Sequence, residues 1–184
     1  QQRRQGFIDG LKEVVPDCTI CLSANSQAHF QTAYQLTTDA LSIYPHINII
    51  FAINDITAQG ASQACVDLGI DSSEMLILPF GLEGDTMKDA LMAHGYCRAG
   101  LAMFPEIVGR ECIDAAIVAY SRDEMAPSIE TPYAIVTPDT LQNFYTRTPQ
   151  GWGINREAVR ENLGYHFELE SHPDSTANIP ERIR

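Results

Sequence analysis

The sequence lacks several features that would assign it to common functional classes. No apolar run approaches the roughly 20 residues that a membrane-spanning helix needs, so we predict no membrane segment. Basic residues are also scarce, with 12 Lys and Arg against 24 Asp and Glu and a formal charge of −12. Nucleic-acid binding depends on a basic surface that displaces counterions, so we expect no direct contact with DNA or RNA. The sequence opens at Gln1 without an initiator Met or a signal peptide, and we interpret it as a fragment.

Patterns for metal and redox chemistry are also missing. Five cysteines are an odd number, which argues against a disulfide framework. Cys18 and Cys21 form a C-T-I-C motif, but they lie in an apolar run up to Ser23 that predicts a strand. Residues three apart on a strand point to opposite faces, so we favour two buried strand thiols over a metal or redox pair. The five histidines show no paired ligand spacing, so we predict neither a metal site nor a cofactor.

No catalytic motif is visible in the sequence. There is no G-x-S-x-G elbow, Walker-type glycine loop, G-x-G-x-x-G turn or H-E-x-x-H pair. A small flavodoxin-like α/β enzyme would need a nucleophile, a phosphate loop or a cofactor site at its strand ends. We therefore predict that the protein is not an enzyme.

Helical and strand patterns alternate over the first 120 residues. Apolar residues recur at helical spacing in some segments, and others are short, nearly continuous apolar runs typical of strands covered on both faces. We predict helices over 3–15, 30–44, 54–68, 86–94 and 105–120, and strands over 18–23, 47–53, 75–80 and 97–103.

This alternation predicts an α/β fold. The connections between strands are too long for hairpins, which implies a three-layer sandwich with a mostly parallel sheet and helices on both faces. After Ser121 the pattern weakens to a linker-like stretch at 127–132, a strand at 133–136, and a helix at 155–163 with Asn155 as N-cap and Gly164 as stop. From Glu168 to Pro180 we expect an irregular, loosely held tail. We divide the chain into a lobe over 1–145 and an extension or linker over 146–184.

Ligands of open parallel sheets bind outside the carboxyl ends of the strands. Here those ends are the 24–27 loop, Asn54-Asp55, the 81–85 loop and Met103-Phe104. One interpretation is a single rim around a small polar ligand. The other is ordinary turn and cap chemistry, in which Asn54 or Asp55 caps a helix and Asn25 makes a turn.

Charged residues near this rim leave similar alternatives. Glu83 and Asp85 could form a carboxylate pair, although acids in a glycine loop are more often solvated. Arg3 and Arg4 stand at a helix start, where the helix dipole disfavours cations, and this indicates an anionic or hydroxyl-rich partner near them.

Several short motifs, in this order and spacing, resemble type I periplasmic sugar-binding proteins and the related lac-repressor effector domains. The resemblance covers about residues 3–145. The motifs are R-R-Q-G-F at 3–7, I-I-F-A-I-N-D at 49–55 with small residues following, L-I-L-P-F-G at 76–81, M-F-P-E at 103–106 with Gly109, and T-P-Y-A-I-V-T at 131–137.

The resemblance implies the second, C-terminal lobe of a two-lobed protein that closes on a hinge around a sugar- or polyol-like ligand. Such a protein would act in transport or sensing with a membrane transporter or sensor, in the periplasm or otherwise outside the cytoplasm. The alternative is the effector domain of a cytoplasmic lac-repressor-like regulator. The 131–137 segment and the long tail favour the transport type.

The resemblance also implies a ligand site. Arg3 is similar to the family's ligand-contacting arginine, and Asn54 is similar to its asparagine. Gly81 stands where an aspartate is usual, and Met103 stands where a glutamine is usual. Phe30 resembles the family's aromatic wall, although His29 or a core role for Phe30 is also compatible.

Two missing polar groups leave three possibilities open: a less polar ligand, substitution by Glu83 and Asp85, or loss of binding. The family also has a complete first lobe upstream and one strand directly before the first helix. We therefore expect a vacant position beside the most buried strand, filled by something outside these residues or by 179–184.

Overall fold

The computed structural model describes residues 1–121 and 128–166. The chain divides into two compact units, one of Gln1–Ala102 with Ile135–Asp139 and one of Met103–Ala134 with Thr140–Arg184. Among the described helices, none is both long and apolar enough to cross a membrane.

The helices and most strands of the first unit confirm the sequence pattern, with ends that differ by one to a few residues. Helix α3 begins after Asn54, whose side chain caps it, and Gly69 follows its end with φ +68°. The elements are α1 (Gln2–Val14), α2 (Phe30–Ile43), β1 (Ile49–Ala52), α3 (Asp55–Asp67), β2 (Leu76–Pro79), α4 (Asp85–Met92) and β3 (Gly100–Ala102).

β1, β2 and β3 run parallel to one another, as the long connections predicted. β1 and β2 are parallel, with Ile49 opposite Leu76 and Ala52 opposite Pro79. A parallel bridge from Phe80 to Leu101 continues this arrangement to β3, and β3 pairs with β4 (Ala134–Val136). The carboxyl ends of β1 and β2 therefore lie at one edge of the sheet.

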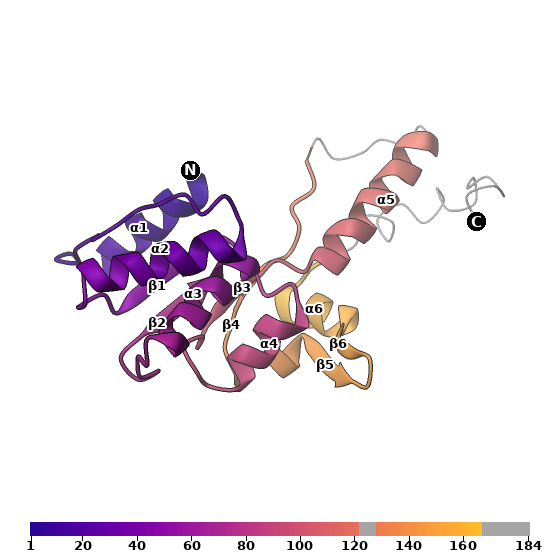
Figure 1. Ribbon diagram of the computed structural model, residues 1–184. Coiled ribbons are helices and arrows are strands. Elements are labelled where there is room, and N and C mark those ends of the chain that lie inside the picture. Colours follow the sequence, from indigo (N-terminus) through magenta and orange to yellow (C-terminus); the bar gives the residue numbers. More distant parts are fainter. Residues whose placement is uncertain (122–127, 167–184) are drawn as a thin grey trace. The chain divides into compact units, whose positions relative to one another are not determined.

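Helices cover the strands of this unit in layers (Figure 1). Phe7 of α1 stacks on Phe51 of β1, with ring centroids 4.4 Å apart. α3 packs on β1 and β2, and α2 packs on α3. Ala58, Ala61 and Ala64 of α3 are almost completely buried. The molecule is an α/β sandwich of the predicted class.

The predicted strand at 18–23 is wrong. These residues adopt no regular secondary structure, and Cys18 and Cys21 are half-buried rather than buried. A strand exists only where another strand accepts and donates its hydrogen bonds, and within the described residues no strand pairs with this segment. The apolar sequence indicated an extended segment but could not show whether a neighbouring strand is present.

The second unit contains α5 (Pro105–Ser121), η1 (Leu141–Asn143), β5 (Tyr145–Thr148), β6 (Gly151–Ile154) and α6 (Arg156–Leu163). Asn155 caps α6, and Gly164 ends it with φ +62°, both as predicted. The antiparallel β5–β6 hairpin was not predicted, because its turn carries Pro149 and Gln150 rather than the usual Asn-Gly signal. Residues 128–132 of the predicted linker form no helix or strand, and the predicted tail from Glu168 lies outside the described residues, as does the 179–184 segment.

Candidate functional site

Arg3 lies at the carboxyl end of β1. It belongs to the first turn of α1, which the Phe7–Phe51 stack holds over the strand. Its Nη1 donates a hydrogen bond to the carbonyl oxygen of Ile53 at 2.9 Å, and its guanidinium carbon lies 4.3 Å from the centroid of the Phe80 ring. A guanidinium has five N–H donors, so this exposed side chain keeps donors for further oxygen atoms.

The neighbouring Arg4 meets a different partner. Its Nε donates to the hydroxyl oxygen of Ser23 at 2.7 Å. The sequence indicated anionic or hydroxyl-rich partners near the two arginines, and inside this unit they meet a carbonyl oxygen and a hydroxyl group.

Asn54 directly follows β1 and caps α3. Its Oδ1 accepts a hydrogen bond from the backbone N–H of Thr57 at 3.0 Å. The Thr57 hydroxyl oxygen in turn accepts a hydrogen bond from the backbone N–H of Asn54, which completes a capping box. The cap interpretation of this residue is therefore correct. None of the hydrogen bonds of Asn54 to other described residues uses its amide Nδ2, so the side chain keeps a donor at the strand end.

Asp55 anchors the loop that follows β2. The side chain is buried, and its Oδ2 accepts hydrogen bonds from the backbone N–H groups of Glu83 at 2.7 Å and Gly84 at 3.0 Å. Its Oδ1 is buried and has no hydrogen-bond partner among the described residues. The sequence placed Asp55 at the rim or as a cap, and this internal anchoring role was missed. The sequence signal for this role is an acidic residue directly after an apolar strand, together with a glycine-containing loop that can supply backbone N–H groups.

Gly81 occupies the start of this loop with φ +128°, a conformation that side-chain-bearing residues rarely adopt. A Cβ atom at this position would lie 3.1 Å from Asp55 Oδ1 and 3.6 Å from Glu83 Oε1. The exposed Glu83 carboxylate therefore lies beside the space in which a side chain at position 81 would begin. Asp85 is also exposed, in the first turn of α4.

The remaining predicted site residues are Phe30, with His29 as its alternative, and Met103. Phe30 is the first residue of α2 and is 39 % exposed, and His29 is the exposed N-cap of that helix. The loop before them holds Gln27 and Ala28 at φ +55° and +58°, with Asn25 making the predicted turn by accepting from the Gln27 N–H. Met103 is half-buried and begins the second unit.

The structure thus brings together Arg3, Asn54 and Gly81 at the carboxyl ends of β1 and β2. It adds one residue that the sequence did not assign to the site, the aromatic ring of Phe80, and it gives Asp55, which the sequence placed at the rim or as a cap, the role of loop anchor. Donors from Arg3 and Asn54 and an acceptor from Glu83 are the groups that recognise hydroxyl-bearing ligands.

A second feature lies at the opposite, amino end of β1. Cys21 Sγ is 3.7 Å from His46 Nε2, and an open hollow of about 350 Å³ borders the same histidine. The described residues contain no group of three or more side chains that could hold a metal ion. The hollow is lined by Pro45, His46, Ile47, Asn48, Ile70 and Glu74.

Comparison with known proteins identifies the fold. No family model and no curated protein sequence matches the chain. Solved structures similar to it include three transporter proteins. A periplasmic solute-binding protein of an ABC transporter from Actinobacillus succinogenes 130z, with bound D-allose, is 24 % identical with a TM-score of 0.69, over 78 % of this chain and 50 % of that chain.

The other two are also transporter components. A carbohydrate transporter solute-binding protein from Agrobacterium radiobacter, in complex with D-arabinose, is 23 % identical with a TM-score of 0.68, over 76 % of this chain and 46 % of that one. An ABC transporter solute-binding protein from Agrobacterium vitis with bound D-fucose is 23 % identical with a TM-score of 0.66, over 76 % and 47 %.

These likenesses show a periplasmic-binding-protein-like fold of type I. The chain spans about half the length of the solved structures it matches. Those structures are solute-binding proteins that hold sugars, not enzymes, and they do not favour the repressor alternative.

Proposed function

We propose that this chain binds a small, polar, sugar-like ligand without catalysis, at the rim formed by the carboxyl ends of β1 and β2. Residues 1–145 would form the C-terminal lobe of a two-lobed solute-binding protein, with 146–184 as an extension. The proposal combines the fold with the polar groups found at the strand ends, where open α/β sheets bind their ligands.

The observation that carries the proposal is the placement of Arg3. The carbonyl oxygen of Ile53 and the face of the Phe80 ring hold its guanidinium beside Asn54 and Gly81. An arginine held in one orientation can donate two hydrogen bonds in fixed geometry to adjacent ligand oxygens.

A sugar site also needs acceptors, because each hydroxyl group both donates and accepts. We propose that Glu83 supplies the carboxylate that position 81 lacks. Its Oε1 lies 3.6 Å from the place of a Cβ at Gly81, and Asp55 fixes the backbone of the loop that carries it. This arrangement supports substitution by Glu83 over loss of binding.

The neighbours also suggest the biological setting. One of them is a periplasmic protein, and all three are transporter components that bind sugars. We propose by analogy that this chain acts outside the cytoplasm, with a first lobe that completes the site and a membrane transporter as partner.

Calorimetry and thermal shift with D-allose, D-arabinose and D-fucose test the proposal. We expect one of these sugars to raise the melting temperature, because a ligand that binds only the folded state stabilises it.

Two variants test the assigned residues. Arg3→Ala should lower the affinity by about 10-fold or more, because one charge-assisted hydrogen bond is lost. Glu83→Gln should weaken binding in the same assay. Arg98→Ala is the matched control, since Arg98 is an exposed arginine that donates to the carbonyl of Ser72. Unchanged affinity of Arg3→Ala would show that the assigned site is wrong.

A further inference from the structure

A buried carboxylate oxygen at the strand-end rim lacks a hydrogen-bond partner. Asp55 is 8 % exposed, and its Oδ2 accepts two backbone N–H bonds from the loop after β2. Its Oδ1 is almost completely enclosed and has no hydrogen-bond partner among the described residues. Buried polar atoms are nearly always hydrogen-bonded, because an unpaired one loses its hydration without compensation. The unpaired oxygen therefore indicates a donor that the described residues do not supply.

Glu83 places a second carboxylate beside this oxygen. The point beside Gly81 at which a Cβ atom would stand lies 3.1 Å from Asp55 Oδ1 and 3.6 Å from Glu83 Oε1. An N–H···O hydrogen bond spans about 2.7–3.2 Å. One donor atom beside Gly81 can therefore reach both carboxylates after a small movement of the exposed Glu83 side chain. Gly81 keeps this space open because it has no side chain.

No ion pair within the described residues compensates these two carboxylates. Neither Asp55 nor Glu83 forms an ion pair with a described Lys or Arg. Arg3 donates instead to the carbonyl oxygen of Ile53. The buried Lys88 donates from Nζ to the backbone carbonyl of Glu83 at 3.0 Å, not to its carboxylate. Two acidic side chains thus meet at one point of the rim without a direct cationic partner there.

The chemistry of the missing donor follows from these charges. A hydroxyl group has one hydrogen and no charge, so it satisfies one carboxylate and leaves the other uncompensated. A metal ion is not favoured, because the described residues contain no group of three side chains that could hold one. An ammonium group has three N–H donors and a positive charge, so it can bond both carboxylates at once.

We propose that the ligand of this rim carries a primary ammonium group, as an amino sugar does, and that this group binds beside Gly81 between the carboxylates of Asp55 and Glu83. The hydroxyl groups of the same ligand lie toward Arg3 and Asn54, which supply the hydrogen-bond donors of the rim. The inference rests on the proposed sugar site, and it narrows the ligand from sugars in general to cationic sugars.

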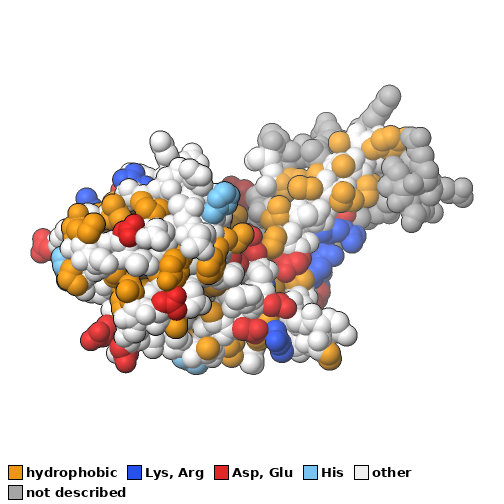
Figure 2. Space-filling view, viewed as in Figure 1, with side chains coloured by type: hydrophobic (Ala, Val, Ile, Leu, Met, Phe, Trp, Pro, Cys, Tyr) orange, Lys and Arg blue, Asp and Glu red, His pale blue; other side chains and the backbone are white. Residues whose placement is uncertain are grey.

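The charge of the whole chain favours a ligand of this class. The formal charge is −12, and Figure 2 shows acidic side chains on the visible face of the molecule. A negative field raises the local concentration of cations and speeds their association. A neutral sugar gains nothing from this field.

Calorimetry with matched sugars tests the inference on the full 184-residue chain. The probes are D-glucosamine and D-galactosamine, in a slightly acidic buffer that keeps the amine protonated. Each is compared with its neutral parent, D-glucose or D-galactose, and with its N-acetyl derivative, which keeps the nitrogen but removes its charge. We expect one of the two amino sugars to bind at least about 10-fold more tightly than both of its comparison sugars, because hydrogen bonds between charged groups are the stronger ones.

Two variants locate the ammonium site. Asp55→Asn keeps the shape of the side chain, so its amide oxygen can still accept the N–H bonds of the loop while the negative charge is removed. Glu83→Gln removes the charge of an exposed side chain. Each should lower the ratio of amino-sugar affinity to neutral-sugar affinity by about 10-fold. The ratio is the readout, so a general loss of sugar affinity does not imitate the expected result.

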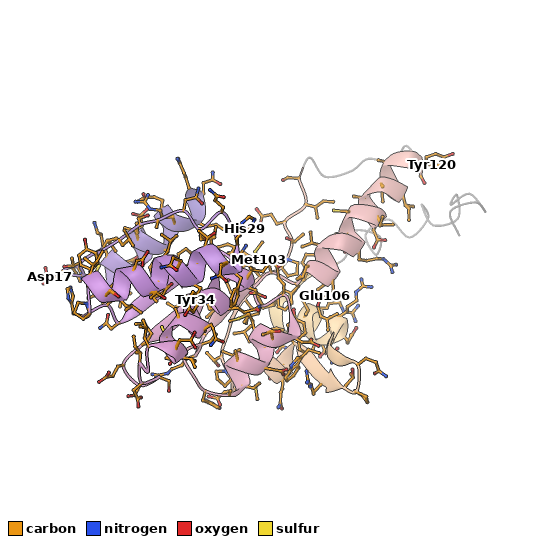
Figure 3. The ribbon with its side chains drawn as sticks, in the orientation of Figure 1. Asp17, His29, Tyr34, Met103, Glu106 and Tyr120 are labelled. Carbon is orange, nitrogen blue, oxygen red and sulfur yellow. The ribbon has the colours of Figure 1, made fainter. Side chains whose placement is uncertain are left out.

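Asp17→Asn is the matched control, because it removes the same charge from an exposed side chain at a distance from the rim. Asp17 follows the end of α1, whose first turn holds Arg3 at the rim. Figure 3 shows Asp17 at the far end of α2 from His29, the N-cap of that helix. This control should keep the preference of the unmodified chain for the amino sugar.

The possible outcomes separate this inference from the proposed function. Binding of a neutral sugar without a preference for either amino sugar would overturn the inference and leave the proposed function in place. A preference that both Asp55→Asn and Glu83→Gln retain, or that Asp17→Asn loses equally, would also overturn it. If neither these sugars nor D-allose, D-arabinose and D-fucose bind, the proposed function fails, and this inference fails with it. If Asp55→Asn does not fold, the exposed Glu83→Gln decides alone.

Discussion

Gly60 permits the close contact between α2 and α3. A Cβ atom at this position would lie 2.4 Å from the carbonyl oxygen of Phe30, and 3.1 Å from the Cβ of Ala33. The obstacle at 2.4 Å is backbone of the neighbouring helix, which no side-chain rotation can move. The absence of a side chain at Gly60 therefore allows α2 and α3 to pack at this short distance.

Gly60→Ala should destabilise the protein although alanine is the better helix former. Overpacking in a well-packed interior costs about 1–3 kcal/mol, which exceeds the gain of about 1 kcal/mol from helix propensity. Urea denaturation measures the change. Gly10→Ala is the matched control, because Gly10 also lies inside a helix but a Cβ atom there would have no other atom within 4 Å. That control should raise stability by several tenths of a kcal/mol or more, and equal effects of the two substitutions would contradict the steric argument.

The start of α3 combines a structural and a proposed binding role in one side chain. Asn54 uses Oδ1 for the helix cap and leaves its amide Nδ2 to the strand-end rim. The two roles use different atoms of the carboxamide, so a suitable substitution separates them.

Asn54→Asp should keep the cap and lose the donor. Aspartate is about as good an N-cap as asparagine, whereas alanine costs about 1 kcal/mol. We expect Asn54→Ala to lower the melting temperature and Asn54→Asp to leave it nearly unchanged, while both weaken the binding of a responsive sugar. Asn155→Ala, which removes the cap of α6, provides the comparison for a cap with no proposed ligand role. A fully functional Asn54→Asp protein would exclude the amide as a ligand donor.

Elements whose signals are local were predicted from the sequence. The helices follow from apolar spacing and from caps such as Asn155 and Gly164, and the β1 and β2 strands follow from uninterrupted apolar runs. The strand predicted at 18–23 was wrong, because a strand forms only beside a partner strand and the residues of the segment do not show whether a partner is present.

The candidate site also combines features that the sequence predicted with features that depend on packing. That Asn54 would lie at a strand end follows from the order of strands and helices, whereas Arg3 was assigned to the site by the family resemblance. The Phe80 ring under Arg3 and the burial of Asp55 depend on which way side chains point after the layers pack, and no short sequence pattern records that.

At the scale of the whole molecule, two buried thiols link stability to alkaline pH. Cys65 and Cys97 are 0 % and 2 % exposed. Burial raises the pKa of the Cys65 thiol to about 11. The pKa of the Cys97 thiol is also raised to about 11, first by burial and then by the negative charge of Asp55. Both groups stay protonated in the folded protein at a pH at which the unfolded chain has begun to ionise.

Stability should therefore fall as the pH rises from about 9 to about 11. Below pH 9 the thiols are protonated in both states and do not affect the balance. Between the two pKa values the unfolded chain releases protons that the folded protein retains, which favours unfolding by up to about 3 kcal/mol per thiol. Urea denaturation at several pH values, in the presence of a reductant, measures the slope of the unfolding free energy against pH.

Cys97→Ala and Cys65→Ala lower stability at every pH because packing is lost. The informative quantity is therefore the slope, which should become shallower in each variant. Cys112 is exposed, and Cys112→Ala should leave the slope unchanged. A slope that is the same in all four proteins would mean that other groups cause the alkaline loss of stability.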